Sequence, residues 1–146
     1  MSEIPDGKDA FDWTKTFAEQ VLTPAQAAAS VENGDSLACS LPEPTGFLYA
    51  LAKRTELKDI TIFIPAPRRG GVAIAKHPGI ELRTPFLTQI MRDAGAHAEV
   101  VPVRLEDWGS FTKRNASRIS IVQVGKPRPD GSVAPGSAIA GNDALV

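Results

Sequence analysis

The side chains that could perform catalysis are few in this sequence of 146 residues. The two histidines, His77 and His97, lie in no spacing typical of a metal site, such as H-E-x-x-H. The single cysteine, Cys39, lies in an apolar run and is predicted to be a buried, unreactive thiol. Glu43 and Asp107 are carboxylates expected in loops, and no G-x-S-x-G motif marks a serine nucleophile. The catalytic residues are therefore unknown from the chemistry alone, and no metal site is expected.

Four segments are expected at the carboxyl ends of strands: 41–46, 65–71, 105–109 and 125–131. All four contain glycine, and three of them contain proline. Glycine lets a backbone approach a ligand closely and proline stiffens a loop, although loops of this kind use both residues in any case. Pro44, Thr45 and Gly46 precede a predicted helix, whose first amides could bind an anion or a carbonyl oxygen. Arg68 and Arg69 could bind phosphate, or could form a solvated basic turn.

Three helices are predicted from capping signals and helical periodicity. Thr23, Pro24 and Gln26 have the pattern of a capping box with proline in the first turn, so a helix is expected from there to Gly34. A second helix is expected over residues 47–54. Thr84-Pro85 repeats the Thr-Pro pattern and predicts a third helix, which is closed by Gly95.

Apolar runs predict the strands of a sheet. They lie at residues 36–40, 59–64, 99–103 and 118–124, and the segment 65–82 is expected to be a long connection. The run at 59–64 is apolar on both faces, which is typical of a parallel strand covered by helices. Alternating strands and helices indicate an α/β fold with an open, mostly parallel sheet flanked by helices and right-handed crossovers.

Composition bounds the remaining possibilities. The formal net charge is −1, which argues against a nucleic-acid partner bound through bulk positive charge. No apolar stretch approaches the ~20 residues that a membrane span needs, so a cytoplasmic protein without a membrane partner is expected. Residues 1–22 are predicted to be an N-terminal arm, whose Phe11, Trp13 and Phe17 cover a surface or belong to a frayed terminus, and residues 23–146 are predicted to form one domain.

The order of several segments resembles the N-terminal domain of the acetyl-CoA hydrolase/transferase family, which includes enzymes similar to 4-hydroxybutyrate/acetate CoA-transferase. Residues 23–35 resemble its helix followed by "x-G-D", and residues 43–54 resemble its "E-P … L … A-L-A-x-R" loop and helix. Residues 57–62 are similar to its "L-K-N-V-x-I" strand entry. Residues 121–131 are similar to its "I-Q-V-S-P-P-D-x-x-G" strand and turn.

The resemblance implies an enzyme that transfers coenzyme A between an acyl-CoA and a small carboxylate, or that hydrolyses acyl-CoA. In that family a glutamate attacks the thioester and forms a glutamyl-CoA intermediate. This glutamate belongs to a C-terminal half that the chain lacks, so the chain is expected to be incomplete without that half or a partner subunit. Coenzyme A, as a substrate, would contact two loops, whose residues are Glu43, Pro44, Thr45, Gly46, Pro127, Pro129, Asp130 and Gly131.

Two other functions stay open at this point. One is a non-catalytic α/β module that binds a ligand or regulates a partner. The other is an unrelated α/β enzyme that acts on a phosphorylated metabolite through Arg68 and Arg69. Whether the chain forms a homo-oligomer is also open.

Overall fold

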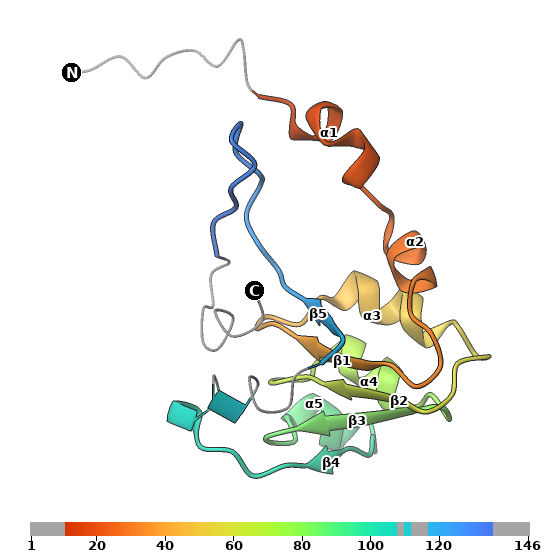
Figure 1. Cartoon of the computed structure of the whole chain (residues 1–146). Helices are drawn as coiled ribbons and strands as arrows, with labels where there is room; N and C mark the ends of the chain where they lie inside the picture. The colour runs from red at the N-terminus through yellow and green to blue at the C-terminus, as the bar shows by residue number, and fades with distance from the viewer. Residues whose placement is uncertain (1–10, 108–109, 112–116, 136–146) are drawn as a thin grey trace.

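A sheet of five parallel strands organises the fold (Figure 1). The computed structural model describes residues 11–107, 110–111 and 117–135. The strands lie in the order β4-β3-β2-β1-β5, and each neighbouring pair is parallel. Their bounds are β1 Ser36–Cys39, β2 Ile60–Phe63, β3 Ile80–Thr84, β4 Glu99–Val100 and β5 Ile119–Ile121. The predicted α/β class with an open parallel sheet is confirmed.

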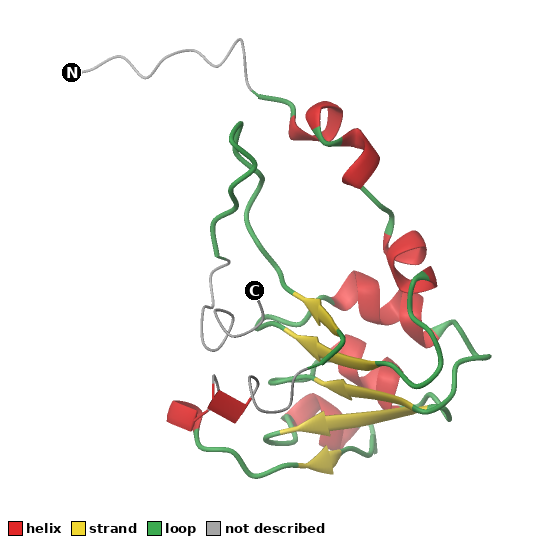
Figure 2. Ribbon diagram, in the orientation of Figure 1, coloured by secondary structure: helices red, strands yellow, loops and turns green. Residues whose placement is uncertain are grey.

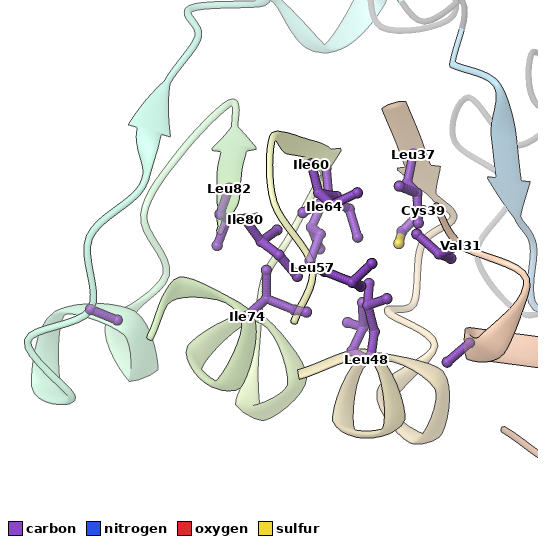
Figure 3. Close-up of a cluster of buried hydrophobic side chains, with 14 of the residues drawn as sticks. Val31, Leu37, Cys39, Leu48, Leu57, Ile60, Ile64, Ile74, Ile80 and Leu82 are labelled. Carbon is purple, nitrogen blue, oxygen red and sulfur yellow. The ribbon is translucent and has the colours of Figure 1, made fainter. Parts of the chain in front are cut away.

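Helices cover one face of this sheet (Figure 2). They are α2 Pro24–Ala29, α3 Thr45–Ala52, α4 Arg69–Ala75 and α5 Gln89–Asp93. The hydrophobic core lies between these helices and the strands, and Figure 3 shows Leu48 of α3 and Ile74 of α4 beneath the strand residues. Leu48 and Ile74 are completely buried. Full burial of such a side chain contributes about 1.5–3 kcal/mol, so this layer supplies most of the stabilisation.

The two faces of the sheet differ because successive strand residues point in opposite directions. In β2, Ile60 and Ile62 are buried in the core, whereas Thr61 and Phe63 are only half-buried on the other face. The ring of Phe63 packs against Phe111, with the ring centroids 5.2 Å apart. The return connection from β4 to β5 contains Phe111, so this contact places part of the connection on the face opposite the helices, as a right-handed crossover requires.

The first helix of the domain has the predicted capping box. Thr23 Oγ1 accepts the amide of Gln26 at 3.2 Å, and Gln26 Oε1 accepts the amide of Thr23 at 2.9 Å. The helix ends earlier than expected, at Ala29 rather than near Gly34. Arg54, at the end of α3, donates to the carbonyl oxygen of Ala28 at 2.7 Å. The same nitrogen donates to the carbonyl oxygen of Val31 at 2.6 Å, so Arg54 satisfies the helix end and fixes α2 on α3.

The prediction that residues 65–82 form a long connection is wrong. This segment contains α4 and most of β3. Gly70 and Gly71 disfavour a helix in isolation, because glycine loses the most backbone entropy. Here both are buried in the first turn of α4, and a Cβ on Gly70 would lie 2.8 Å from Leu48 Cδ1. The helix forms at this point because only glycine allows it to pack so close to α3.

The predicted start of the third helix is also wrong. Thr84 does not cap a helix but ends β3, where it is completely buried and donates to the carbonyl oxygen of Phe86 at 3.0 Å. The helix α5 begins at Gln89, directly after Thr88. A Thr-Pro pair suits a strand end as well as a helix start, because proline tolerates both positions.

The remaining predicted elements occur with shifted ends. The second helix is α3, which starts two residues before the expected Phe47. The predicted strand over 99–103 is reduced to the two residues of β4, and η2, at Leu105–Asp107, is a short 3-10 turn. The predicted strand over 118–124 is only three residues long. It ends because the amide of Gln123 donates to the hydroxyl of Ser40 at 2.8 Å instead of continuing the backbone ladder.

Two segments extend to the same side of the sheet (Figure 1). One is the arm, formed by α1 Trp13–Thr16 and η1 Ala18–Gln20, neither of which has a buried residue. The other is the hairpin of residues 124–135, held by an antiparallel bridge between Val124 and Pro135 and by the amide of Gly125, which donates to the carbonyl oxygen of Ala134 at 2.9 Å. No helix within the described ranges is long and apolar enough to cross a membrane.

Candidate functional site

The sheet has one topological switch point, between β1 and β5. The chain leaves β1 towards β2, β3 and β4, then returns to place β5 on the other side of β1. In open α/β sheets, ligands bind outside the carboxyl ends of the strands at such a point. The candidate site is therefore the rim formed by the loops that follow β1, β2, β3 and β5.

Ser40 closes the switch point. It follows β1 directly and is 1% exposed. Its amide donates to the carbonyl oxygen of Ile121 at 2.8 Å, and its hydroxyl accepts the amide of Gln123. The hydroxyl also donates to the carbonyl oxygen of Pro42 at 3.3 Å. Ser40 thus joins the ends of the two strands and orients the loop that leaves β1.

Glu43 has a different environment from the one expected of a loop carboxylate. It is 5% exposed, and its two carboxylate oxygens accept three backbone amides at the start of α4. These are the amides of Arg68 at 2.7 Å, Gly70 at 2.8 Å and Gly71 at 3.0 Å. The hydroxyl of Thr45 lies 3.1 Å from Oε1. A carboxylate at a helix N-terminus satisfies free amides and the helix dipole, so Glu43 fastens the loop after β1 to α4.

The loop after β2 is fastened in turn to the loop after β3. Thr88 Oγ1 donates to the carbonyl oxygen of Pro67 at 2.5 Å. Pro67 is completely buried and precedes Arg68, whose amide is held by Glu43. Three consecutive loops of the rim are therefore linked by side-chain hydrogen bonds, which is the kind of support that keeps a binding site in one geometry.

The basic pair lies at the outside of this rim. Arg68 and Arg69 stand at the start of α4 and are exposed to solvent. Pro44 and Thr45 are half-buried, and Gly46 is exposed at the first turn of α3. Gly46 also lines a groove of about 460 Å³ between α2 and α3, together with Tyr49 and Lys53.

The second predicted loop lies elsewhere in the molecule. Pro127, Pro129, Asp130 and Gly131 form the tip of the hairpin, which Figure 1 shows away from the sheet and towards α1. The amide of Ser132 donates to Asp130 Oδ1 at 2.9 Å, and hydrogen bonds from Ser132 lower the pKa of Asp130. Gly131 has φ +80°, which favours glycine. The structure thus separates the two sets of residues, and their contact with coenzyme A stays a prediction.

Cys39 and His77, two side chains that could take part in chemistry, are both buried in the fold. Cys39 is 1% exposed, and burial, followed by the nearby charge of Glu43, raises the pKa of its thiol far above the usual range. The prediction of a buried cysteine is confirmed. His77 is buried, with the amide of Gly79 donating to Nδ1 at 3.0 Å and Nε2 lying 3.0 Å from the carbonyl oxygen of Arg54. Within residues 11–107, 110–111 and 117–135, no three His, Cys, Asp or Glu side chains gather as metal ligands would.

Sequence reasoning missed two residues that hold the rim together, Ser40 and Thr88, although a polar residue that ends a buried strand was a usable signal for Ser40. It also missed the pairing of Asp35 with Arg118 at the opposite end of the strands. Asp35 is 6% exposed and accepts Arg118 Nη2 at 2.8 Å. Its pKa is lowered, mainly by the hydrogen bonds from Arg118. The pair ties the start of β1 to the start of β5.

These features define an open parallel α/β domain with a rigid loop rim and, among its described residues, no assembled catalytic group. Its fold matches solved structures of RipA. The crystal structure of RipA from Yersinia pestis aligns with a TM-score of 0.66 and 19% identity, over 84% of this chain and 33% of the RipA chain. A glutamate-to-alanine mutant of RipA aligns with a TM-score of 0.70 and 18% identity, over 84% and 32% of the two chains.

At this level of identity the likeness shows the fold. The chain spans about a third of the length of the RipA chains that it matches. No family model matches the sequence, and the search of curated proteins found no match.

Proposed function

We propose that this chain is the N-terminal part of an enzyme that transfers coenzyme A between an acyl-CoA and a carboxylate, or that hydrolyses acyl-CoA. The remaining part, in the same chain or in a partner subunit, would carry the nucleophilic glutamate. The proposal rests on the sequence resemblance, and the α/β fold that the resemblance implies is the fold observed.

One observation carries the proposal furthest: the segments that resemble the family pack together around β1. The first segment, residues 23–35, is bound to the third, residues 57–62, through the amide of Lys58, which donates to Asn33 Oδ1 at 2.9 Å. The last segment, residues 121–131, begins at the end of β5, where the carbonyl oxygen of Ile121 accepts the amide of Ser40. The first and third segments are thus bound to each other, and the last segment begins at the switch point, where an α/β ligand is expected.

The surroundings of Glu43 support the division of labour between two parts. A nucleophilic carboxylate must reach the substrate, whereas both oxygens of Glu43 are held by buried amides of α4. In this proposal Glu43 positions the loop of Pro44 to Gly46 against the acyl-CoA and does not attack it. The attacking glutamate must then come from the other part.

The test is reconstitution with the polypeptide encoded directly downstream. The chain and that polypeptide are purified separately and mixed with acetyl-CoA and a carboxylate acceptor, and both release of free coenzyme A and exchange between acyl groups are measured. We expect turnover from the mixture and none from either part. Full-rate turnover by this chain alone would contradict the split site, because none of its described groups is placed as a nucleophile.

The burial of the one carboxylate at the centre of the rim also favours a second candidate, a non-catalytic binding module. Titration calorimetry of the isolated chain with coenzyme A, acetyl-CoA and nucleotides separates the two. Tight binding by the chain alone, together with no turnover after mixing, would favour the module.

The substitutions Arg68→Ala and Arg69→Ala test the phosphate-binding alternative in the same experiment, because loss of all binding would place the ligand phosphate on the exposed start of α4.

A further inference from the structure

The arm and the hairpin leave an apolar groove open between them. It measures about 590 Å³ and is lined by Trp13, Phe17 and Leu22 of the arm and by Val122, Val124 and Pro127 of the hairpin side. Seven large hydrophobic residues are exposed among those that the structure describes, and four of them, Val21, Leu22, Val124 and Val133, lie on these two segments. Such a concentration marks an interaction surface, since scattered single residues would need no explanation.

The groove continues into an unpaired strand edge. Among the described residues, β5 is the last strand of the sheet and pairs with β1 alone. The carbonyl oxygen of Ile121 and the amide of Gln123 both point towards β1, where they bind Ser40. Because backbone groups alternate along a strand, the amide and carbonyl groups of Ser120 and Val122 point away from the sheet. Val122 therefore belongs both to the free edge and to the lining of the groove.

We propose that the β5 edge and the arm–hairpin groove together bind an extended segment of the polypeptide that completes the protein. The segment would add a strand beside β5 through hydrogen bonds to Ser120 and Val122 and would place alternate apolar side chains in the groove. Backbone pairing of this kind supplies affinity, and the apolar positions supply specificity. This proposal rests on the proposed function for the nature of the partner, but its surface is defined by the structure.

The lengths of the matched structures favour this occupant over a second copy of the chain. The RipA chains share the fold over 84% of this chain, yet this chain spans only 32–33% of them. The RipA chains therefore carry about twice as much polypeptide again, and in this proposal a corresponding part packs on the domain. The opposite edge offers less: β4 has two residues, and Arg83 and Glu99, whose side chains lie 2.6 Å apart, place charges there.

The experiment measures the binding of this chain to the polypeptide encoded directly downstream, by biolayer interferometry. Ser120→Pro removes an outward amide, and Val124→Asp places a charge in the groove. We expect either variant to weaken binding at least tenfold. The matched controls are Ser120→Ala, which keeps the amide, and Val100→Asp, which charges an equally exposed valine on the opposite edge of the sheet. Both controls should bind as the unmodified chain does.

Hydrogen exchange of the unmodified chain gives a reading that does not depend on any variant folding. In the complex, the amides of Ser120 and Val122 should become protected, and unchanged exchange at both would overturn the proposal. No binding to the downstream polypeptide, or binding that Val124→Asp leaves unaffected, would also overturn it. So would a homodimer of the isolated chain that Val124→Asp dissociates, because the occupant would then be a second copy.

The outcome for this surface is separable from that for the function. Binding through the β5 edge without acyl-CoA turnover would refute the enzyme and keep the surface. Turnover by a mixture that contains Val124→Asp, at the unmodified rate and the unmodified affinity, would keep the enzyme and refute the surface.

Discussion

Glu43 illustrates how one side chain can be predicted at the right place with a different set of contacts. It lies in the loop after β1, as expected, but its carboxylate is turned inwards onto three amides at the start of α4. Those amides belong to residues 25 to 28 positions further along the chain. Buried amides without a partner cost free energy, so Glu43 stabilises the rim as a whole.

Replacing Glu43 tests that role. Glu43→Ala leaves buried amides unpaired and should lower the free energy of unfolding by about 2–4 kcal/mol. Glu43→Gln, which offers a single acceptor oxygen, should cost about 1–3 kcal/mol. Urea denaturation followed by far-UV circular dichroism measures both. The control Glu19→Gln changes an exposed residue of the arm and should remain within about 0.5 kcal/mol of the unmodified chain. Equal stability of Glu43→Gln and this control would contradict the role.

Asp35 gives the fold a dependence on pH whose sign follows from its pKa. Arg118 lowers the pKa of Asp35 in the folded state. The carboxylate therefore contributes stability above its unfolded pKa, near 4, and this contribution is lost as the pH falls through the folded pKa. Asp35→Asn should be less stable than the unmodified chain at pH 7, and the gap should narrow by pH 3. Denaturation curves at both values measure it, and a gap that is the same at both would contradict the pairing. Arg118→Met should also be less stable than the unmodified chain at pH 7, and this difference in stability should likewise narrow by pH 3.

At the scale of elements, α4 is the part of the fold that local rules predict worst. Its first turn contains Gly70 and Gly71, which local propensity assigns to a loop. A Cβ on Gly71 would fall on the ring of Pro67, and a Cβ on Gly70 would lie 3.0 Å from Glu43 Oε1. The absence of side chains lets the start of α4 approach both the buried carboxylate and the loop after β2. The packing gain thus outweighs the poor helix propensity of glycine.

A matched pair of glycine substitutions separates packing from propensity. Gly71→Ala should destabilise the fold by about 1–3 kcal/mol, because the added methyl group overlaps Pro67. Gly46→Ala lies in the first turn of α3, where its Cβ would meet only Pro24 Cγ at an ordinary 3.7 Å. It should be neutral or should stabilise by up to about 1 kcal/mol. Thermal unfolding of both variants measures the difference, and a stabilised Gly71→Ala would show that α4 is not tightly packed.

At the scale of the whole molecule, stability and recognition belong to different parts. Among the residues that the structure describes, the buried ones lie between residue 28 and residue 96, in the sheet and the helices packed on it. The arm has no buried residue in α1 or η1. Trp13 and Phe17 instead line the groove beside the hairpin, and Phe11 packs edge to face on Phe17 with the ring centroids 6.1 Å apart. The predicted division at residue 22 stays a prediction.

Deleting residues 1–22 tests the division. Because the described part of the arm, residues 11–22, contributes no residue to the core, the truncated chain should keep its circular dichroism spectrum and lose less than about 1 kcal/mol of unfolding free energy. The same truncation removes half of the groove lining and should weaken the partner complex. Unfolding of the truncated chain under conditions where the full chain is stable would show that the arm is part of the folded unit.

Several features of the fold could be predicted because their signals are local. The capping box of Thr23 and Gln26, the burial of Cys39 and the β2 strand each depend on a few neighbouring residues. Hydrophobic periodicity then identifies the α/β class, since alternating strands and helices bury their apolar faces in few ways. Helix and strand ends were less predictable, because Ser40 and Arg54 end them through partners in other elements.

What the sequence by itself determined is the class of fold, the capping of α2, the apolar strands and the loops that could meet a ligand. The tertiary structure alone decided that β5 lies beside β1, that Glu43 is bound to α4, and that the hairpin tip lies away from the other predicted loop. The physical reason is sequence separation. Ser40 and Gln123 are 83 residues apart, and Glu43 and Gly70 are 27 apart. Contacts at such distances form only when the whole core has packed, so no local pattern encodes them.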